Sequence, residues 1–163
     1  MKNNKLLSRL ALLVALSAVA AYIPIPSPTG TVALDSAPGY FAVLAFGGGS
    51  GALVLGLGHI FSSLKSGFPL GALHLLIALL MAACGLIYAW LYRKFNIVFS
   101  SIIAVILNGI GISATLIPIL GMGFFAAMTL PLLTGSLINV LAAVILYQLL
   151  KNRLDGIANG DKA

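Results

Sequence analysis

The stretch Gly47-Gly48-Gly49-Ser50-Gly51 decides the fold, because it interrupts the apolar block Ala37–Leu64. Four of its five residues are glycine, which is a poor helix interior and a strong turn signal. If the block formed one helix, the chain would cross a membrane five times. If it formed two short helices hinged at the glycines, the chain would cross six times. The second interpretation places helices at residues 36–46 and 50–64.

Four further apolar blocks flank this one, and each suits a single crossing of about 20 residues. Together the blocks predict helices at residues 6–22, 36–46, 50–64, 70–92, 97–120 and 124–150. The first block resembles a signal peptide, but everything after it is equally apolar, so we interpret it as the first span. Residues 1–163 then form a single membrane domain.

The positive charges distinguish the two topologies, because cytoplasmic loops of membrane proteins carry an excess of Lys and Arg. With six spans and both termini cytoplasmic, only Lys65 lies outside. The basic residues on the cytoplasmic side are then Lys2, Lys5, Arg9, Arg93, Lys94, Lys151, Arg153 and Lys162. Five spans would divide the charges almost equally. The sequence therefore predicts six spans.

Composition supports a membrane protein throughout. Hydrophobic residues make up 61% of the 163 residues and charged residues 7%, whereas soluble domains carry roughly 25% charged residues. The mean hydropathy is +1.13. The surroundings of most of the chain are thus a lipid bilayer, and we expect a multi-pass protein of the plasma membrane. The net charge of +6 follows from the cytoplasmic ends and does not indicate nucleic acid.

Several kinds of chemistry are missing from the sequence. No Walker A motif is present, so the chain has no ATPase of its own. The three acids are Asp35, Asp155 and Asp161, which leaves no carboxylate in the middle of a predicted span to relay protons. Neither enzyme motifs nor metal-ligand spacings occur, and the lone Cys84 excludes a disulfide. We expect no enzyme, cofactor or metal, but a binding subunit that another protein drives.

The candidate binding residues gather at the predicted outer end of the bundle. Asp35 lies at the mouth of the second helix, His59 and His74 lie near the outer ends of the third and fourth helices, and Lys65 lies between them. Polar side chains within spans usually have a partner or a function. Each also has a simpler explanation: Asp35 as a helix cap, the histidines as links between helices, and Lys65 as a side chain reaching the interface.

The fifth predicted helix adds Asn108 and Thr115, which are seven residues apart and would share one helical face. Asn108 has the alternative role of a link between helices. The proline-rich segment 23–35, which we expect outside, has the character either of a lid over the bundle or of a passive connector.

The chain resembles the substrate-binding S component of an energy-coupling factor (ECF) vitamin transporter in size, six helices, basic cytoplasmic ends and a long first outer loop. In that family, a coupling transmembrane subunit and two ATPase subunits supply the energy. The family's Ala-x-x-x-Ala coupling motif in the first helix is matched by Ala11-Leu12-Leu13-Val14-Ala15. The resemblance implies that Ala11 and Ala15 contact the partner, and small residues four apart do allow close approach of another helix.

Within this family, the segment from Thr29 to Tyr40, with Gly58-His59 and Ser66-Gly67-Phe68-Pro69, is most similar to S components assigned to α-ribazole, a cobalamin precursor. A flat benzimidazole would stack on Tyr40 or Phe68, and ribose hydroxyls would bond to polar side chains. Lys65 keeps anionic ligands open, such as pantothenate or a phosphorylated ribazole. An S component for a thiamine precursor is a further alternative. A non-transport structural membrane subunit is the alternative of a different class.

Overall fold

The computed structural model describes the backbone of residues 2–160 and the side chains of residues 4–154. Lys162 and Asp161, which entered the charge analysis, lie outside the described residues. The elements in chain order are α1 (Lys2–Ala20), the 3-10 turn η1 (Leu34–Ser36), α2 (Ala37–Phe46), α3 (Gly48–Lys65), α4 (Leu73–Lys94), α5 (Ile97–Ile106), the π-helical turn η2 (Leu107–Gly111), α6 (Ile112–Thr115) and α7 (Ile117–Gly160).

The described part of the chain forms six helices, as predicted, when α5, η2 and α6 are taken as the single continuous helix that they build. The glycine-rich stretch does divide its block in two. Gly47 has φ 91° and ψ 172°, a left-handed backbone region that glycine enters without steric penalty. The chain therefore reverses at Gly47, and α2 and α3 form a hairpin.

Several predicted helix ends need correction. The predictions followed the ends of apolar runs, whereas a helix ends where its backbone hydrogen bonds end. The first helix is Lys2–Ala20, not 6–22, the third begins at Gly48, and the fourth is Leu73–Lys94. The predicted helix 97–120 ends at Thr115, and Pro118 lies in the first turn of the next helix, where its missing N–H removes no helical hydrogen bond. The last helix runs from Ile117 to Gly160 with a break at Gly121 (φ 78°), so its long part begins at residue 122.

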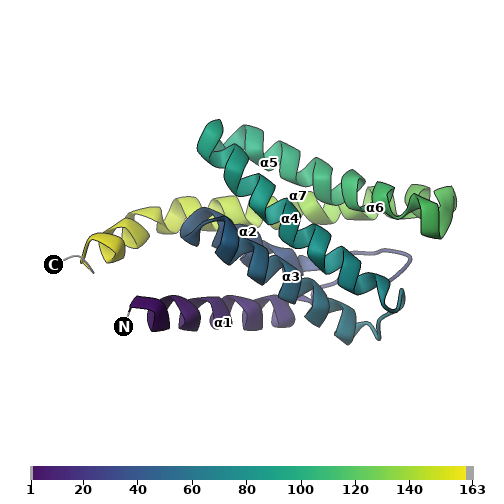
Figure 1. Cartoon of the computed structure of the whole chain (residues 1–163), viewed down its shortest axis with the longest axis horizontal. Helices are drawn as coiled ribbons and strands as arrows, with labels where there is room; N and C mark the ends of the chain where they lie inside the picture. The colour runs from purple at the N-terminus through teal and green to yellow at the C-terminus, as the bar shows by residue number, and fades with distance from the viewer. Residues whose placement is uncertain (1, 161–163) are drawn as a thin grey trace.

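The helices lie roughly side by side along the long axis, and both ends of the chain are found at the same end of the bundle (Figure 1). The α2–α3 turn and the α4–α5 turn lie at this end too, whereas the α3–α4 loop lies at the other (Figure 1). Among the described residues, three helices are long and apolar enough to cross a membrane: Leu73–Lys94, Ile97–Thr115 and Ile117–Leu154. With only 10 residues, α2 extends about 15 Å. It is too short to cross a bilayer core of about 30 Å unless it packs against the longer neighbouring helices.

The segment between α1 and α2, residues 21–33, folds back on itself as an irregular hairpin. Pro24 and Ala33 form an isolated antiparallel bridge. The hydroxyls of Ser62 and Ser66 at the end of α3 donate to the carbonyls of Thr31 and Gly30 at 3.3 and 3.2 Å. This hairpin is therefore held against α3, and its second half turns inward to become η1.

Candidate functional site

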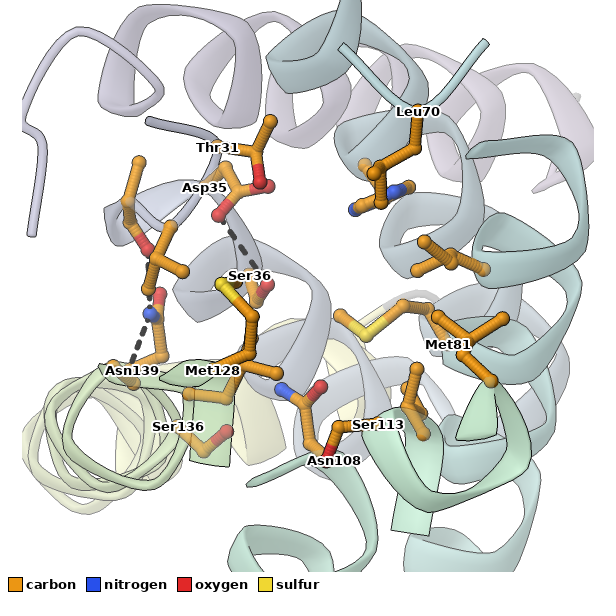
Figure 2. A pocket seen from close by; sticks show the side chains of 18 of the residues that line it. Thr31, Asp35, Ser36, Leu70, Met81, Asn108, Ser113, Met128, Ser136 and Asn139 are labelled. Atoms are coloured by element: carbon orange, nitrogen blue, oxygen red, sulfur yellow. Dashed lines mark hydrogen bonds between the residues drawn. The ribbon is translucent and has the colours of Figure 1, made fainter. Parts of the chain in front are cut away.

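A polar pocket lies where the hairpin 21–33, η1 and four helical segments (α3, α4, η2–α6 and α7) meet. About 60 Å³ of it is open to a water-sized sphere, room for a few water molecules. Figure 2 shows side chains from these separate segments facing one central space. Its polar lining consists of Thr31, Asp35, Ser36, His59, Asn108, Ser113, Ser136 and Asn139.

Asp35 lies in η1 and is 5% exposed. Its carboxylate receives a long hydrogen bond, 3.5 Å, from the Ser36 hydroxyl (Figure 2). The simpler explanation of Asp35 as a helix cap does not hold, because Ser36 occupies the N-cap position of α2 and the first N–H of that helix, on Ala37, donates to the side chain of Asn139. The carboxylate is instead turned toward the pocket (Figure 2), where it can accept hydrogen bonds from a ligand.

Asn139 of α7 connects that helix to the backbone on either side of η1. Its amide nitrogen donates to the carbonyls of Ala33 and Gly135, each at 2.8 Å, and its amide oxygen accepts from the backbone N–H of Ala37 at 2.7 Å. These bonds join α7 to both ends of η1. Backbone groups that leave regular structure must find such partners when water is excluded.

Asn108 reaches the pocket from a π-helical turn. The turn Leu107–Gly111 inserts an extra residue per turn, and such turns are frequent at functional sites. Gly109 within it packs so closely on α7 that a β-carbon would lie 2.6 Å from the Leu133 side chain. Because the turn shifts the register, Thr115 does not share the pocket face with Asn108. The Thr115 hydroxyl donates to the Ile112 carbonyl at 2.7 Å.

His59 lines the pocket, and His74 stands directly behind it. The ring atoms His59 Nε2 and His74 Nδ1 are 3.2 Å apart, and His74 is fully buried. Phe68 packs edge-on against His74, with ring centroids 5.7 Å apart. The two histidines thus come together as the sequence suggested, but His74 is not among the residues that line the pocket.

Two other candidates lie away from the pocket wall. Tyr40 is fully buried and packs edge-on against Tyr88, with centroids 5.8 Å apart. The ammonium group of Lys65 lies 5.7 Å from the centre of the Tyr22 ring, an arrangement that satisfies the cation at the surface. Among the described residues, no Lys or Arg lines the pocket.

Among the pocket residues that sequence reasoning missed are Ser113, Ser136 and two methionines. Ser136 is 2% exposed, and its hydroxyl has no hydrogen-bond partner within the described structure. It precedes Asn139 by three residues, so both share a helical face, and that spacing inside an apolar run was the available signal. Met81 from α4 and Met128 from α7 approach the central space from different walls (Figure 2).

Ala11 and Ala15 line an apolar groove on the surface between α1 and α3. Both alanines are exposed in this chain. We call this surface the α1–α3 groove, and it is lined by Leu7, Leu10, Ala11, Val14, Ala15 and Ala18 of α1 with Leu53, Leu57 and Phe61 of α3. Nothing charged lines it, so it can be filled by lipid or by a helix of another protein.

Comparison with known proteins gives two findings. Residues 5–158 match the family described as "ECF transporter, substrate-specific component". The fold is similar to a solved structure described as "Structure and mechanism of the S component of a bacterial ECF transporter", with a TM-score of 0.66 and 22% sequence identity over 96% of this chain and 98% of that chain. No curated protein sequence matches this chain significantly.

Proposed function

We propose that this chain, which belongs to the family of ECF transporter substrate-specific components, binds α-ribazole from outside the cell for import. Six membrane-spanning helices with both termini cytoplasmic would present the pocket to the exterior. A coupling transmembrane subunit and two ATPase subunits would supply the energy. This arrangement agrees with the positions of both termini at one end of the bundle (Figure 1).

One observation carries the choice of ligand: the pocket combines neutral hydrogen-bonding groups and one carboxylate with apolar walls. Apart from Asp35, its polar side chains are hydroxyls, amides and an imidazole. Ribose hydroxyls suit such groups because each hydroxyl both donates and accepts. A dimethylbenzimidazole suits the apolar wall, including the thioethers of Met81 and Met128.

The position of Lys65 argues against an anionic vitamin such as pantothenate. That cation, the reason for keeping anionic ligands open, packs on Tyr22, and among the described residues no Lys or Arg lines the pocket to pair with a ligand carboxylate. A thiamine precursor gains no specific support from the pocket. We therefore rank α-ribazole above both, and transport above a purely structural role.

Binding requires the pocket to widen. Sites for small molecules typically have volumes of about 300–1,000 Å³, several times the 60 Å³ open here. The hairpin 21–33 is the natural moving part, because it forms part of the pocket wall without belonging to a helix. The hydroxyl-to-carbonyl bonds that attach it to α3 are long, 3.2 and 3.3 Å, and would be the ones to break. We expect the hairpin to act as the lid that the sequence suggested.

Three experiments test this proposal. Mass spectrometry of small molecules released from the protein purified from its own cells should find α-ribazole, and added α-ribazole should raise the melting temperature more than pantothenate or thiamine. Reporter fusions after Leu64 and Arg93 should report outside and inside, respectively. Pantothenate in place of α-ribazole would refute the ligand, and an inside signal after Leu64 would refute the topology.

A further inference from the structure

The two histidines and Ser63 form a closed hydrogen-bonded cluster beside the pocket. Ser63 Oγ lies 2.8 Å from His74 Nδ1 and donates to the His59 carbonyl at 2.7 Å. His59 Nε2 lies 3.2 Å from His74 Nδ1 and 3.3 Å from Ser63 Oγ. These distances restrict which ring nitrogens can carry protons.

A backbone hydrogen bond indicates which ring nitrogen of His74 carries the proton. The N–H of Leu70 donates to His74 Nε2 at 3.3 Å, so Nε2 offers a lone pair. A neutral imidazole with an accepting Nε2 carries its proton on Nδ1. That Nδ1–H finds an acceptor in Ser63 Oγ, whose own proton is already engaged with the His59 carbonyl.

The assignment then passes to His59. His59 Nε2 lies 3.2 Å from His74 Nδ1, which carries the His74 proton. A proton on His59 Nε2 as well would place two N–H groups facing each other, which is repulsive. His59 Nε2 is therefore the accepting nitrogen, and neutral His59 carries its proton on Nδ1. Within the described residues, no hydrogen bond reaches His59 Nδ1, while His59 itself lines the pocket.

We propose that His59 presents its Nδ1–H to an acceptor atom of the ligand, and that His74 is the positioning residue that fixes this tautomer. The inference deepens the proposed function and rests on it for the ligand. In α-ribazole the acceptor is the unsubstituted ring nitrogen of the benzimidazole, which carries a lone pair in the ring plane. The pocket thus selects heteroaromatic rings with such a nitrogen over rings that have C–H there.

The tautomers can be tested without any ligand. Nitrogen-15 NMR of histidine-labelled protein in detergent separates protonated from unprotonated ring nitrogens. We expect both His59 and His74 to be protonated at Nδ1 and unprotonated at Nε2. In a His74→Phe variant, His59 should return to the Nε2–H tautomer that free histidine favours. A protonated Nε2 on His59 in the unmodified protein would overturn the inference, whatever the ligand proves to be.

The ligand contact is tested with a pair of compounds, α-ribazole and its 5,6-dimethylindole riboside, in which C–H replaces the accepting nitrogen. One hydrogen bond should make the unmodified protein prefer α-ribazole by roughly five- to tenfold. His59→Phe should abolish this preference and His74→Phe should reduce it. The control Leu75→Ala, at a neighbouring position that is 61% exposed, should retain it.

The outcomes separate the two proposals. Equal binding of both compounds by the unmodified protein would overturn the role of His59 and leave α-ribazole as the ligand. Failure of α-ribazole to bind would refute the proposed ligand alone, and the NMR assignment would then decide the inference about the histidines.

Discussion

The pocket and the α1–α3 groove are two hollows of one small bundle with opposite chemistry. Eight polar side chains line the pocket, contributed by segments from Thr31 to Asn139. Among the residues with described side chains, the groove is lined by apolar side chains of two helices. Buried polar groups are costly in a membrane protein, so their concentration in the pocket indicates a ligand. The groove lacks them, which suits a surface that exchanges lipid for a partner helix.

The two hollows also differ in how they are held. Side-chain hydrogen bonds between distant segments shape the pocket, such as those from Asn139 to Ala33 and Ala37. The groove exists because several side chains along α1 are small, among them Ala11 and Ala15, and leave space between α1 and α3. Changes to the pocket should therefore act through lost bonds, and changes to the groove through added volume.

The largest expected effect comes from Asn139→Leu, which removes the clamp that shapes the pocket. The Ala33 carbonyl and the Ala37 N–H would lose their partners in a buried place, and each such group costs about 1–3 kcal/mol. We expect the free energy of unfolding to fall by about 2–4 kcal/mol, measured by denaturation in detergent. Asn96→Ala, which removes an exposed helix cap, should cost only about 1 kcal/mol. Equal losses would show that the clamp is ordinary capping.

The second prediction concerns the groove. Ala15→Trp would fill it and hold a partner helix away, so uptake by the complete transporter should fall about tenfold or more. Ligand binding by the isolated chain should persist because the pocket is remote. Leu12→Trp provides the control, since Leu12 is 70% exposed on α1 but does not line the groove. A parallel loss of binding and uptake would make the alanines structural.

The third prediction concerns Asp35, the one carboxylate of the pocket. Asp35→Asn keeps the shape of the side chain but replaces one oxygen of the carboxyl group with an NH₂ donor, and the affinity for α-ribazole should fall by about 1–2 kcal/mol. The ligand-induced rise in melting temperature would shrink accordingly. If the ligand-free protein melts lower but the ligand-induced rise is unchanged, Asp35 serves the fold and not the ligand.

The smallest expected effect lies away from both hollows. Tyr88→Phe removes the hydroxyl that lies 3.0 Å from Ser101 Oγ, between α4 and α5. Stability should decrease by about 0.5–1.5 kcal/mol, and neither ligand affinity nor uptake should change. A change in affinity would extend the binding site beyond the residues that line the pocket.

The sequence predicted the helices well because glycines and charges are local signals. The glycine-rich stretch at Gly47 predicted a turn that divides one apolar block into two helices, and the structure has this turn. The total of six helices follows from that division. Asp35, His59 and Asn108, which the sequence placed together, do line one pocket.

The rest of the site depends on register and on contacts between distant segments. The spacing of Asn108 and Thr115 predicted a common face, but the π-helical turn changes that face, and no local pattern announces such a turn. Lys65 was assigned to the site by depth alone, whereas its direction is set by the Tyr22 ring. Ser136 escaped notice because a single hydroxyl in an apolar helix is usually satisfied by its own backbone.

The Asn139 clamp also constrains the order in which the protein can be completed during synthesis. The N–H of Ala37 at the start of α2 donates to the side chain of Asn139, which is 102 residues later in the chain. At translation rates of about 5–20 residues per second, that interval is about 5–20 seconds. Throughout it, the N–H at the start of α2 lacks the amide oxygen that it bonds in the finished fold. The ribosome must therefore synthesise residue 139 before the segments around the pocket can reach their final arrangement.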